Sequence, residues 1–229
     1  MQLKDFAKIY FAILLLHLVT IFKQDEGVLH ILSKGLLLFS LLTFYAQHPQ
    51  ARLQTFKNML LLAFGFSWLG DLFLLGESST FFLMGLAAFA AAHVFFLGVH
   101  WSVKGAHWQY SKIAMVLLVT LVSWFLTAYY LPLPPQIKVY ALAYAFLLLS
   151  HLAMAIYNFW VGNLKFYPLL GMALFLASDL VLAINAFVHE SLYASLAVMF
   201  LYGVGQFLIA MGFLQYQGAS ALEPTESKS

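Results

Sequence analysis

Long apolar segments limit what this chain can fold into more than any other feature of its sequence. A helix needs about 20 mostly apolar residues to cross the hydrocarbon core of a bilayer. Eight segments meet or nearly meet that length, and the connections between them are short. We therefore predict an all-α polytopic membrane protein, a bundle of eight transmembrane helices, with spans at Phe6–Phe22, Val28–Ala46, Phe56–Gly76, Thr80–His100, Tyr110–Tyr130, Gln136–Ile156, Phe166–Val188 and Leu192–Gln215.

The composition supports a membrane protein and excludes several other classes. Of the 229 residues, 63% are hydrophobic and only 9% are charged, which is too few charges for a soluble domain of this size. The absence of cysteine excludes disulfides and thiolate metal sites. The net charge of +2 is scattered, so we expect membrane lipids and no nucleic acid as partners.

Local sequence signals mark several ends of the predicted spans. Glu77-Ser78-Ser79-Thr80 is typical of a capped helix start, and Pro168 suits the first turn of a helix. Prolines at 132, 134 and 135 separate the fifth and sixth spans. We predict a transmembrane domain over residues 1–217 and a disordered cytoplasmic tail over residues 218–229, where the sequence becomes small and polar.

The basic residues predict the orientation in the membrane. If the N-terminus is cytoplasmic, only Lys23 and Lys138 of the loop lysines and arginines lie outside. The positive-inside rule then places both termini in the cytoplasm.

Two aspartates interrupt the apolar spans. Asp71 lies within Phe66–Leu75 and Asp179 within Phe175–Leu182. A charge at the centre of a membrane helix costs about 2.5–3.5 kcal/mol on insertion scales, so such residues usually serve a function. The match of Gly70-Asp71 with Ser178-Asp179 also suggests two parallel four-helix halves.

Other polar residues lie at helical spacing around the two aspartates. At about 1.5 Å per residue, Lys34, Asp71 and Asp179 lie about 8 to 13 Å below the outer ends of their spans, so we expect them to meet. His93 is predicted nearer the middle, and His151 near the inner interface. We predict a polar pocket with aromatic walls, whose further members are Ser67, Phe89, His93, Tyr140, Phe175, Ser178, Tyr202 and Gln206.

Structural explanations compete with each of these assignments. Asp71 and Lys34 would form a structural ion pair, or Lys34 would extend its ammonium group towards the interface. Gly85 and Gly171 are typical of close packing between membrane helices. His93, Tyr202 and Gln206 would serve as interhelical hydrogen-bond partners.

The pattern of these motifs resembles the YhhN family of membrane proteins, the bacterial and animal lysoplasmalogenases. The resemblance covers nearly the whole chain and rests on the order and spacing of several short motifs. Gly35 departs from the family, in which a proline usually follows the early lysine. The motifs that carry the resemblance are Lys34, Phe66-Ser67 with Gly70-Asp71, Gly85 with Phe89 and His93, Gly171 with Phe175 and Ser178-Asp179, and Tyr202 with Gln206.

The resemblance implies a hydrolase that cleaves the vinyl-ether bond of a lysoplasmalogen. It also implies an integral protein of the bacterial inner (cell) membrane. Vinyl ethers open by protonation of the outer alkene carbon, followed by attack of water on an oxocarbenium ion. Two carboxylates suit this chemistry, as in glycosidases, with Asp71 and Asp179 as acid and base in either order. A carboxyl group in apolar surroundings can hold a proton at neutral pH, whereas one beside Lys34 stays ionised.

Two functions of other classes remain open at this point. One is a metal-dependent lipid hydrolase with Asp71, Asp179 and His93 as zinc ligands. The other is a non-enzymatic, proton-coupled lipid transporter or receptor. The vinyl-ether mechanism itself requires no metal and no cofactor.

Overall fold

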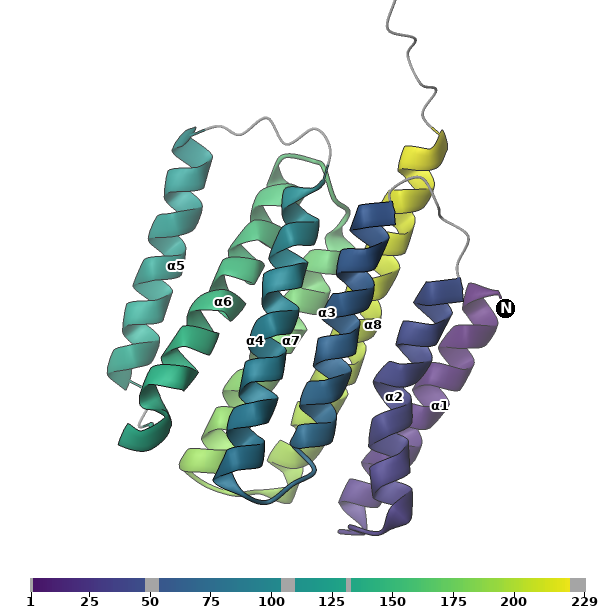
Figure 1. Cartoon of the computed structure of the whole chain (residues 1–229), viewed down its shortest axis with the longest axis vertical. Coiled ribbons are helices and arrows are strands. Elements are labelled where there is room, and N and C mark those ends of the chain that lie inside the picture. Colours follow the sequence, from purple (N-terminus) through teal and green to yellow (C-terminus); the bar gives the residue numbers. More distant parts are fainter. Residues whose placement is uncertain (1, 48–53, 104–109, 131–132, 223–229) are drawn as a thin grey trace, which may run out of the picture.

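The fold is known from a computed structural model that describes residues 2–47, 54–103, 110–130 and 133–222. The described residues form eight α-helices in one bundle (Figure 1). Their bounds are α1 Leu3–Phe22, α2 Val28–Gln47, α3 Gln54–Phe73, α4 Ser79–Trp101, α5 Tyr110–Tyr130, α6 Pro135–Trp160, α7 Phe166–Phe187 and α8 Leu192–Leu222.

The helices match the eight predicted segments closely, with two informative differences. Helix α3 ends at Phe73 rather than Gly76, so Asp71 lies in its last turn. Helix α8 continues to Leu222, so the first residues of the predicted tail from Gly218 are helical. Alanine and leucine favour helix there, which the small, polar character of the segment concealed. Residues 223–229 of the predicted tail lie outside the described residues.

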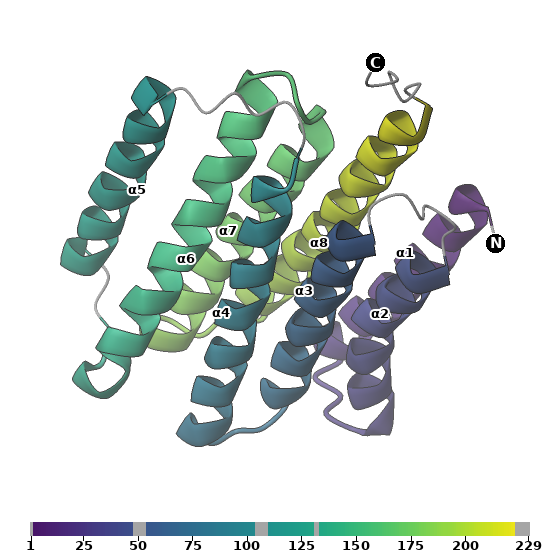
Figure 2. The same ribbon diagram turned by 45° about the horizontal axis from the view of Figure 1, so that its top comes forward.

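Six of the described helices are long and apolar enough to cross a membrane, which confirms a polytopic membrane protein. These six are α1, α2, α4, α6, α7 and α8. Helix α3 lies among these six helices (Figure 2). It carries Lys57, Asn58 and Asp71, which make it more polar than they are. Eight spans therefore remain a prediction.

The helices pack in sequence order within each half of the chain. Helix α1 packs on α2, α2 on α3 and α3 on α4, and the same series joins α5, α6, α7 and α8. Helices α4 and α6 join the halves on one side, and α1 and α2 contact α8 on the other. The proposed two-half repeat stays a prediction.

Close helix contacts occur where glycines were predicted to permit them. A Cβ atom on Gly171 of α7 would lie 2.6 Å from the carbonyl oxygen of Gly205 on α8. A Cβ atom on Gly85 of α4 would lie 3.0 Å from Leu74 and 3.4 Å from the carbonyl oxygen of Gly70. Helix α3, which carries Asp71, is thus packed tightly against α4. Helix α7, which carries Asp179, is packed in the same way against α8.

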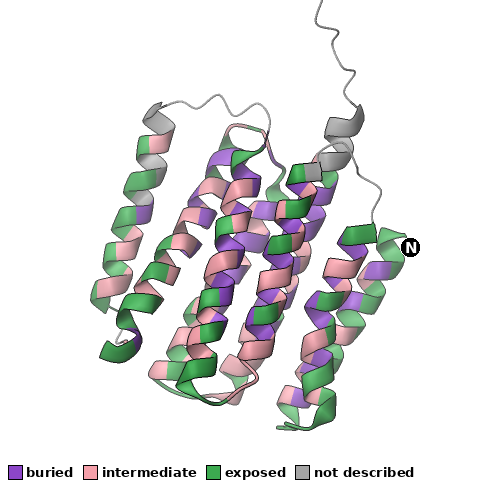
Figure 3. Ribbon diagram, in the orientation of Figure 1, coloured by how far each residue is buried: buried purple, intermediate pink, exposed green. Residues whose placement is uncertain are grey.

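The bundle has an apolar outside and several polar side chains inside. Large apolar residues such as Leu15, Leu118 and Phe125 are more than half exposed on the outer faces (Figure 3). Polar residues that include Ser67, Asp71 and His93 are buried. An exterior of this kind suits lipid, and the buried polar groups require partners within the bundle. We call the end with the α3–α4 and α7–α8 loops the outer end, and the end with the α6–α7 loop the inner end.

Candidate functional site

A cavity of about 670 Å³ lies in the outer half of the bundle and contains both aspartates. Apolar side chains such as Leu74, Phe89, Leu148 and Met199 form much of its wall. Gly76, Glu77 and Ser78 of the α3–α4 loop lie at its outer end. The other polar and charged side chains of the lining are Lys34, Asp71, Ser79, Ser123, Thr127, Tyr144, Ser178, Asp179 and Tyr202.

Asp71 is the more buried of the two aspartates, with only 3% of its surface exposed. The hydroxyl of Tyr202 on α8 donates a hydrogen bond of 2.9 Å to Oδ2 of Asp71. The neighbouring Gly70 allows the ring of Phe89 to pack against α3, since a Cβ atom there would lie 2.7 Å from that ring. The glycine before the aspartate therefore serves to bring the aromatic wall onto α3.

Asp179 lies on α7 and is partly buried. The hydroxyl of Tyr144 on α6 donates a hydrogen bond to Oδ2 of Asp179. The preceding Ser178 lines the cavity, but its hydroxyl donates to the backbone oxygen of Val198 at 2.9 Å. Ser178 therefore helps to fix α7 against α8, while Asp179 faces the cavity with a tyrosine partner, as Asp71 does.

Lys34 supplies a cation to the same cavity from α2. It lies close enough to Asp71 for electrostatic attraction. Within the described part of the chain, however, the two side chains form no ion pair. The indole nitrogen of Trp68 donates a 2.8 Å hydrogen bond to the backbone oxygen of Gly35, which holds α2 against α3 beside Lys34.

Comparison with known proteins identifies the family. Residues 29–213, which include every residue of the cavity lining, match the YhhN family. The chain belongs to the YhhN family. It is 35% identical over 136 residues to a protein from Sus scrofa named lysoplasmalogenase TMEM86B. That similarity covers 58% of this chain and about half, 54%, of the relative. No solved structure matches the chain.

The structure of this YhhN protein brings six of the predicted site residues to the cavity. They are Lys34, Asp71, Phe89, Ser178, Asp179 and Tyr202. Lys34, Asp71 and Asp179 thus line the same cavity, and the roles predicted for them stay predictions.

Four other predicted residues lie buried behind the cavity lining. Ser67 is one turn before Asp71, and Gln206 is one turn after Tyr202. The Ser67 hydroxyl has no hydrogen-bond partner among the described residues, and the Gln206 amide interacts with the Tyr202 hydroxyl. Phe175 packs its ring edge-on against Phe89 and His93.

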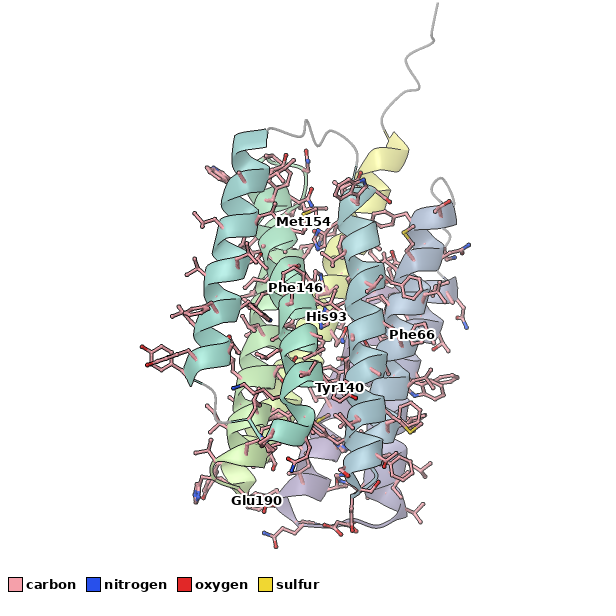
Figure 4. All side chains as sticks on the ribbon, turned by 60° about the vertical axis from the view of Figure 1, so that its left-hand side comes forward. Phe66, His93, Tyr140, Phe146, Met154 and Glu190 are labelled. Atoms are coloured by element: carbon pink, nitrogen blue, oxygen red, sulfur yellow. The ribbon has the colours of Figure 1, made fainter. Side chains whose placement is uncertain are left out.

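Tyr140 is the predicted residue that the structure does not bring to the site. Its side chain is 59% exposed and does not line the cavity (Figure 4). Tyr144, one turn further along α6, contacts the aspartate instead. Helical spacing places both tyrosines on nearly the same face of α6, so spacing alone could not choose between them.

His151 has a partner that was not predicted. It was expected near the inner interface, and only 1% of its surface is exposed. Its Nδ1 atom lies 3.0 Å from Nδ1 of His93. The two histidines come from α4 and α6, whose contact joins the two halves of the chain, and no local sequence signal predicts that pairing.

The described residues do not support the alternative of a zinc site. Among them, no group of three or more His, Asp or Glu side chains is arranged to hold a metal ion. His93 is engaged with His151 and Tyr144 rather than placed beside Asp71. The proposed ligand set of Asp71, Asp179 and His93 is therefore not assembled.

Proposed function

We propose that this YhhN protein is a lysoplasmalogenase. It would hydrolyse the vinyl-ether bond of an alkenyl lysophospholipid to a fatty aldehyde and glycerophosphocholine or glycerophosphoethanolamine. The observation that carries the proposal is that Asp71 and Asp179 line one cavity with largely apolar walls. The similarity to a protein named lysoplasmalogenase supports the choice of substrate.

The size and lining of the cavity suit a lipid with one chain. Ligand pockets commonly have volumes of about 300–1,000 Å³, and this cavity of about 670 Å³ lies within that range. Leu148, Leu176 and Met199 offer an apolar surface to the alkenyl chain. Lys34 offers the phosphate group a positive charge.

The hydrogen bonds around the aspartates suggest a role for each. Asp71 accepts a hydrogen bond from Tyr202 and lies near the Lys34 ammonium group, and both interactions stabilise a carboxylate. Asp71 is therefore assigned as the ionised group that stabilises the oxocarbenium ion and accepts a proton from water. Asp179, without a neighbouring lysine in the lining, is assigned as the general acid.

These roles give a balanced reaction. Asp179 gives its proton to the outer alkene carbon, and the electron pair of the double bond forms the new C–H bond. Water attacks the oxocarbenium carbon and loses a proton to Asp71, which yields a hemiacetal. The C–O bond to glycerol then breaks, the leaving oxygen takes the proton from Asp71, and the hemiacetal hydroxyl returns its proton to Asp179. No net proton is consumed.

The deciding experiment is mass spectrometry of products formed by purified full-length protein in detergent. The substrates are three lysolipids with the same head group and chain length but a vinyl-ether, ester or alkyl-ether linkage. We expect aldehyde from the vinyl-ether lipid and no cleavage of the other two, because neither has an alkene carbon to protonate. Release of product in detergent would exclude a transporter, since transport has no meaning without a membrane. Activity that is lost with a chelator and restored by zinc would favour the metal-dependent hydrolase.

A further inference from the structure

A continuous series of buried polar side chains leads away from Asp179 towards the inner end of the bundle. Tyr144 donates to Asp179, and its oxygen lies 3.3 Å from Nε2 of His93. Nδ1 of His93 lies 3.0 Å from Nδ1 of His151. Both histidines are buried, and His93 lies at mid-height of the bundle (Figure 4). The series thus passes from the cavity into the interior, across the contact of α4 with α6.

The direction of these hydrogen bonds depends on whether Asp179 is ionised or protonated. When Asp179 is ionised, the one hydroxyl hydrogen of Tyr144 goes to it, so the Tyr144 oxygen can accept from Nε2–H of His93. His93 then presents a bare Nδ1, which accepts from Nδ1–H of His151. All donors therefore point at Asp179, and the order reverses when Asp179 carries the proton.

A second group of polar side chains continues towards the inner end. The His100 ring lies 5.1 Å from the His151 ring, measured between centroids. The amide nitrogen of Asn158 lies 3.2 Å from Nδ1 of His100 and 3.3 Å from the backbone oxygen of His100. The Nε2 atom of His100 is buried and has no partner among the described residues.

The far end of this group reaches the surface region of the inner end. The side-chain amide of Asn163 lies 3.5 Å from the amide oxygen of Asn158. Asn163 belongs to the α6–α7 loop and is partly exposed. The two groups together span the distance from the cavity to that loop.

We propose that this series is a proton path that equilibrates Asp179 with the aqueous phase at the inner end. The relay series consists of Tyr144, His93, His151 and His100, and Asn158 positions the ring of His100. Each imidazole would accept a proton on one ring nitrogen and release one from the other. The inference rests on the proposed function, because it concerns the protonation of the general acid.

Such a path has a purpose even though hydrolysis consumes no net proton. A bound lysolipid would fill the cavity and place its head group at the outer end, so water there would be separated from Asp179. The hemiacetal returns a proton to Asp179 at the end of each turnover. A path from the opposite end replaces any proton that Asp179 loses before the next turnover, without passing the substrate. The other titratable groups that face the site are Asp71 from α3, Glu77 from the α3–α4 loop, Tyr202 from α8 and Lys34 from α2.

The test measures hydrolysis in vesicles that hold the full chain in one orientation, with the pH set separately on each side. The variants are His151→Gln, which keeps a hydrogen-bonding side chain but cannot pass a proton, and His93→Gln as a second interruption. His17→Gln is the matched control, because His17 is a buried histidine outside the relay series, and its Nδ1 bonds Ser33 of α2.

We expect the wild-type rate of hydrolysis to fall by up to about tenfold for each unit by which the pH at the inner end rises. Tenfold is the change per pH unit in the protonated fraction of an acid when the pH exceeds its pKa. The His151→Gln and His93→Gln variants should lose this response, and His17→Gln should keep it. A rate that follows only the pH at the outer end would overturn the proposal. So would a His151→Gln variant that keeps the wild-type response to the inner pH.

A second measurement separates this proposal from the proposed function. Infrared spectroscopy follows deuterium exchange at the Asp179 carboxyl group, identified by the band that Asp179→Asn removes. An alkyl-ether lysolipid fills the cavity during the measurement. Slower exchange in His151→Gln than in wild type supports the path even if no vinyl ether is hydrolysed. Equal exchange in the two proteins overturns the path even if hydrolysis is observed.

Discussion

Replacing Gly171 with alanine should weaken the α7–α8 contact that positions both tyrosine–aspartate pairs. The new Cβ atom would lie 2.6 Å from the Gly205 carbonyl oxygen and 2.8 Å from the backbone nitrogen of Ile209. Ordinary contacts begin at 3.4 Å, so the backbones have to separate locally by 3.4 minus 2.6, or about 0.8 Å. Both obstacles are backbone atoms, which a rotamer change cannot remove.

The size of the effect follows from this displacement. Overpacking of a tight contact costs about 1–3 kcal/mol, which corresponds to a Tm lower by about 2–12 °C for a chain of this size. Gly205 is three residues from Tyr202, the donor to Asp71. Since a misplacement of about 1 Å at a catalytic site can cost about 100-fold, we expect hydrolysis to fall by about 10- to 100-fold.

Two measurements on the purified protein in detergent test this prediction. One is the temperature of thermal unfolding, and the other is the rate of aldehyde release by the folded protein. Gly65→Ala is the matched control, because a Cβ atom on Gly65 of α3 would meet nothing within 4 Å. The control should be at least as stable as wild type. If Gly171→Ala unfolds at the same temperature as Gly65→Ala, the close α7–α8 contact does not exist as described.

Three further predictions concern the site, the reaction and the orientation. Asp71→Asn and Asp179→Asn should each lower the rate of vinyl-ether hydrolysis by about 10²–10⁴-fold while the protein stays folded. The control Asp5→Asn, at an exposed aspartate, should leave that rate unchanged. Wild-type turnover in both cavity variants would refute carboxylate catalysis. In heavy-oxygen water the glycerol product should contain no solvent oxygen, since the bond from the alkenyl carbon to oxygen is the one that breaks; label in that product would mean cleavage on the glycerol side. A reporter fused after Ser229 should read as cytoplasmic, as the distribution of lysines predicts, and a signal from the opposite side would reverse the assignment of inner and outer ends.

The sequence predicted the helices well because the signal for a membrane helix is local. A run of about 20 apolar residues forms a helix in lipid whatever its neighbours are, since every backbone hydrogen bond is made within the segment. The capped start predicted at Ser78 was confirmed, because Ser78 accepts a hydrogen bond from the backbone nitrogen of Phe81. The end of α8 was missed because helix propensity at Ala219–Leu222 outweighs the small, polar character of that segment.

The two aspartates could also be identified from the sequence, because a charge in an apolar helix is expensive wherever it occurs. The sequence further predicted that Lys34, Asp71 and Asp179 meet, since their depths follow from a fixed rise per residue. These inferences use only distance along a helix.

What surrounds the aspartates was decided by the tertiary structure alone. The choice of Tyr144 over Tyr140, and the pairing of His93 with His151, depend on how α4 and α6 face each other. His93 and His151 are 58 residues apart in the chain, so neither residue carries a local signal of the other. The sequence by itself determined which residues are costly to bury, because that cost belongs to each side chain. Only the packed bundle decided which partners offset it, because a hydrogen bond between helices depends on the position of both.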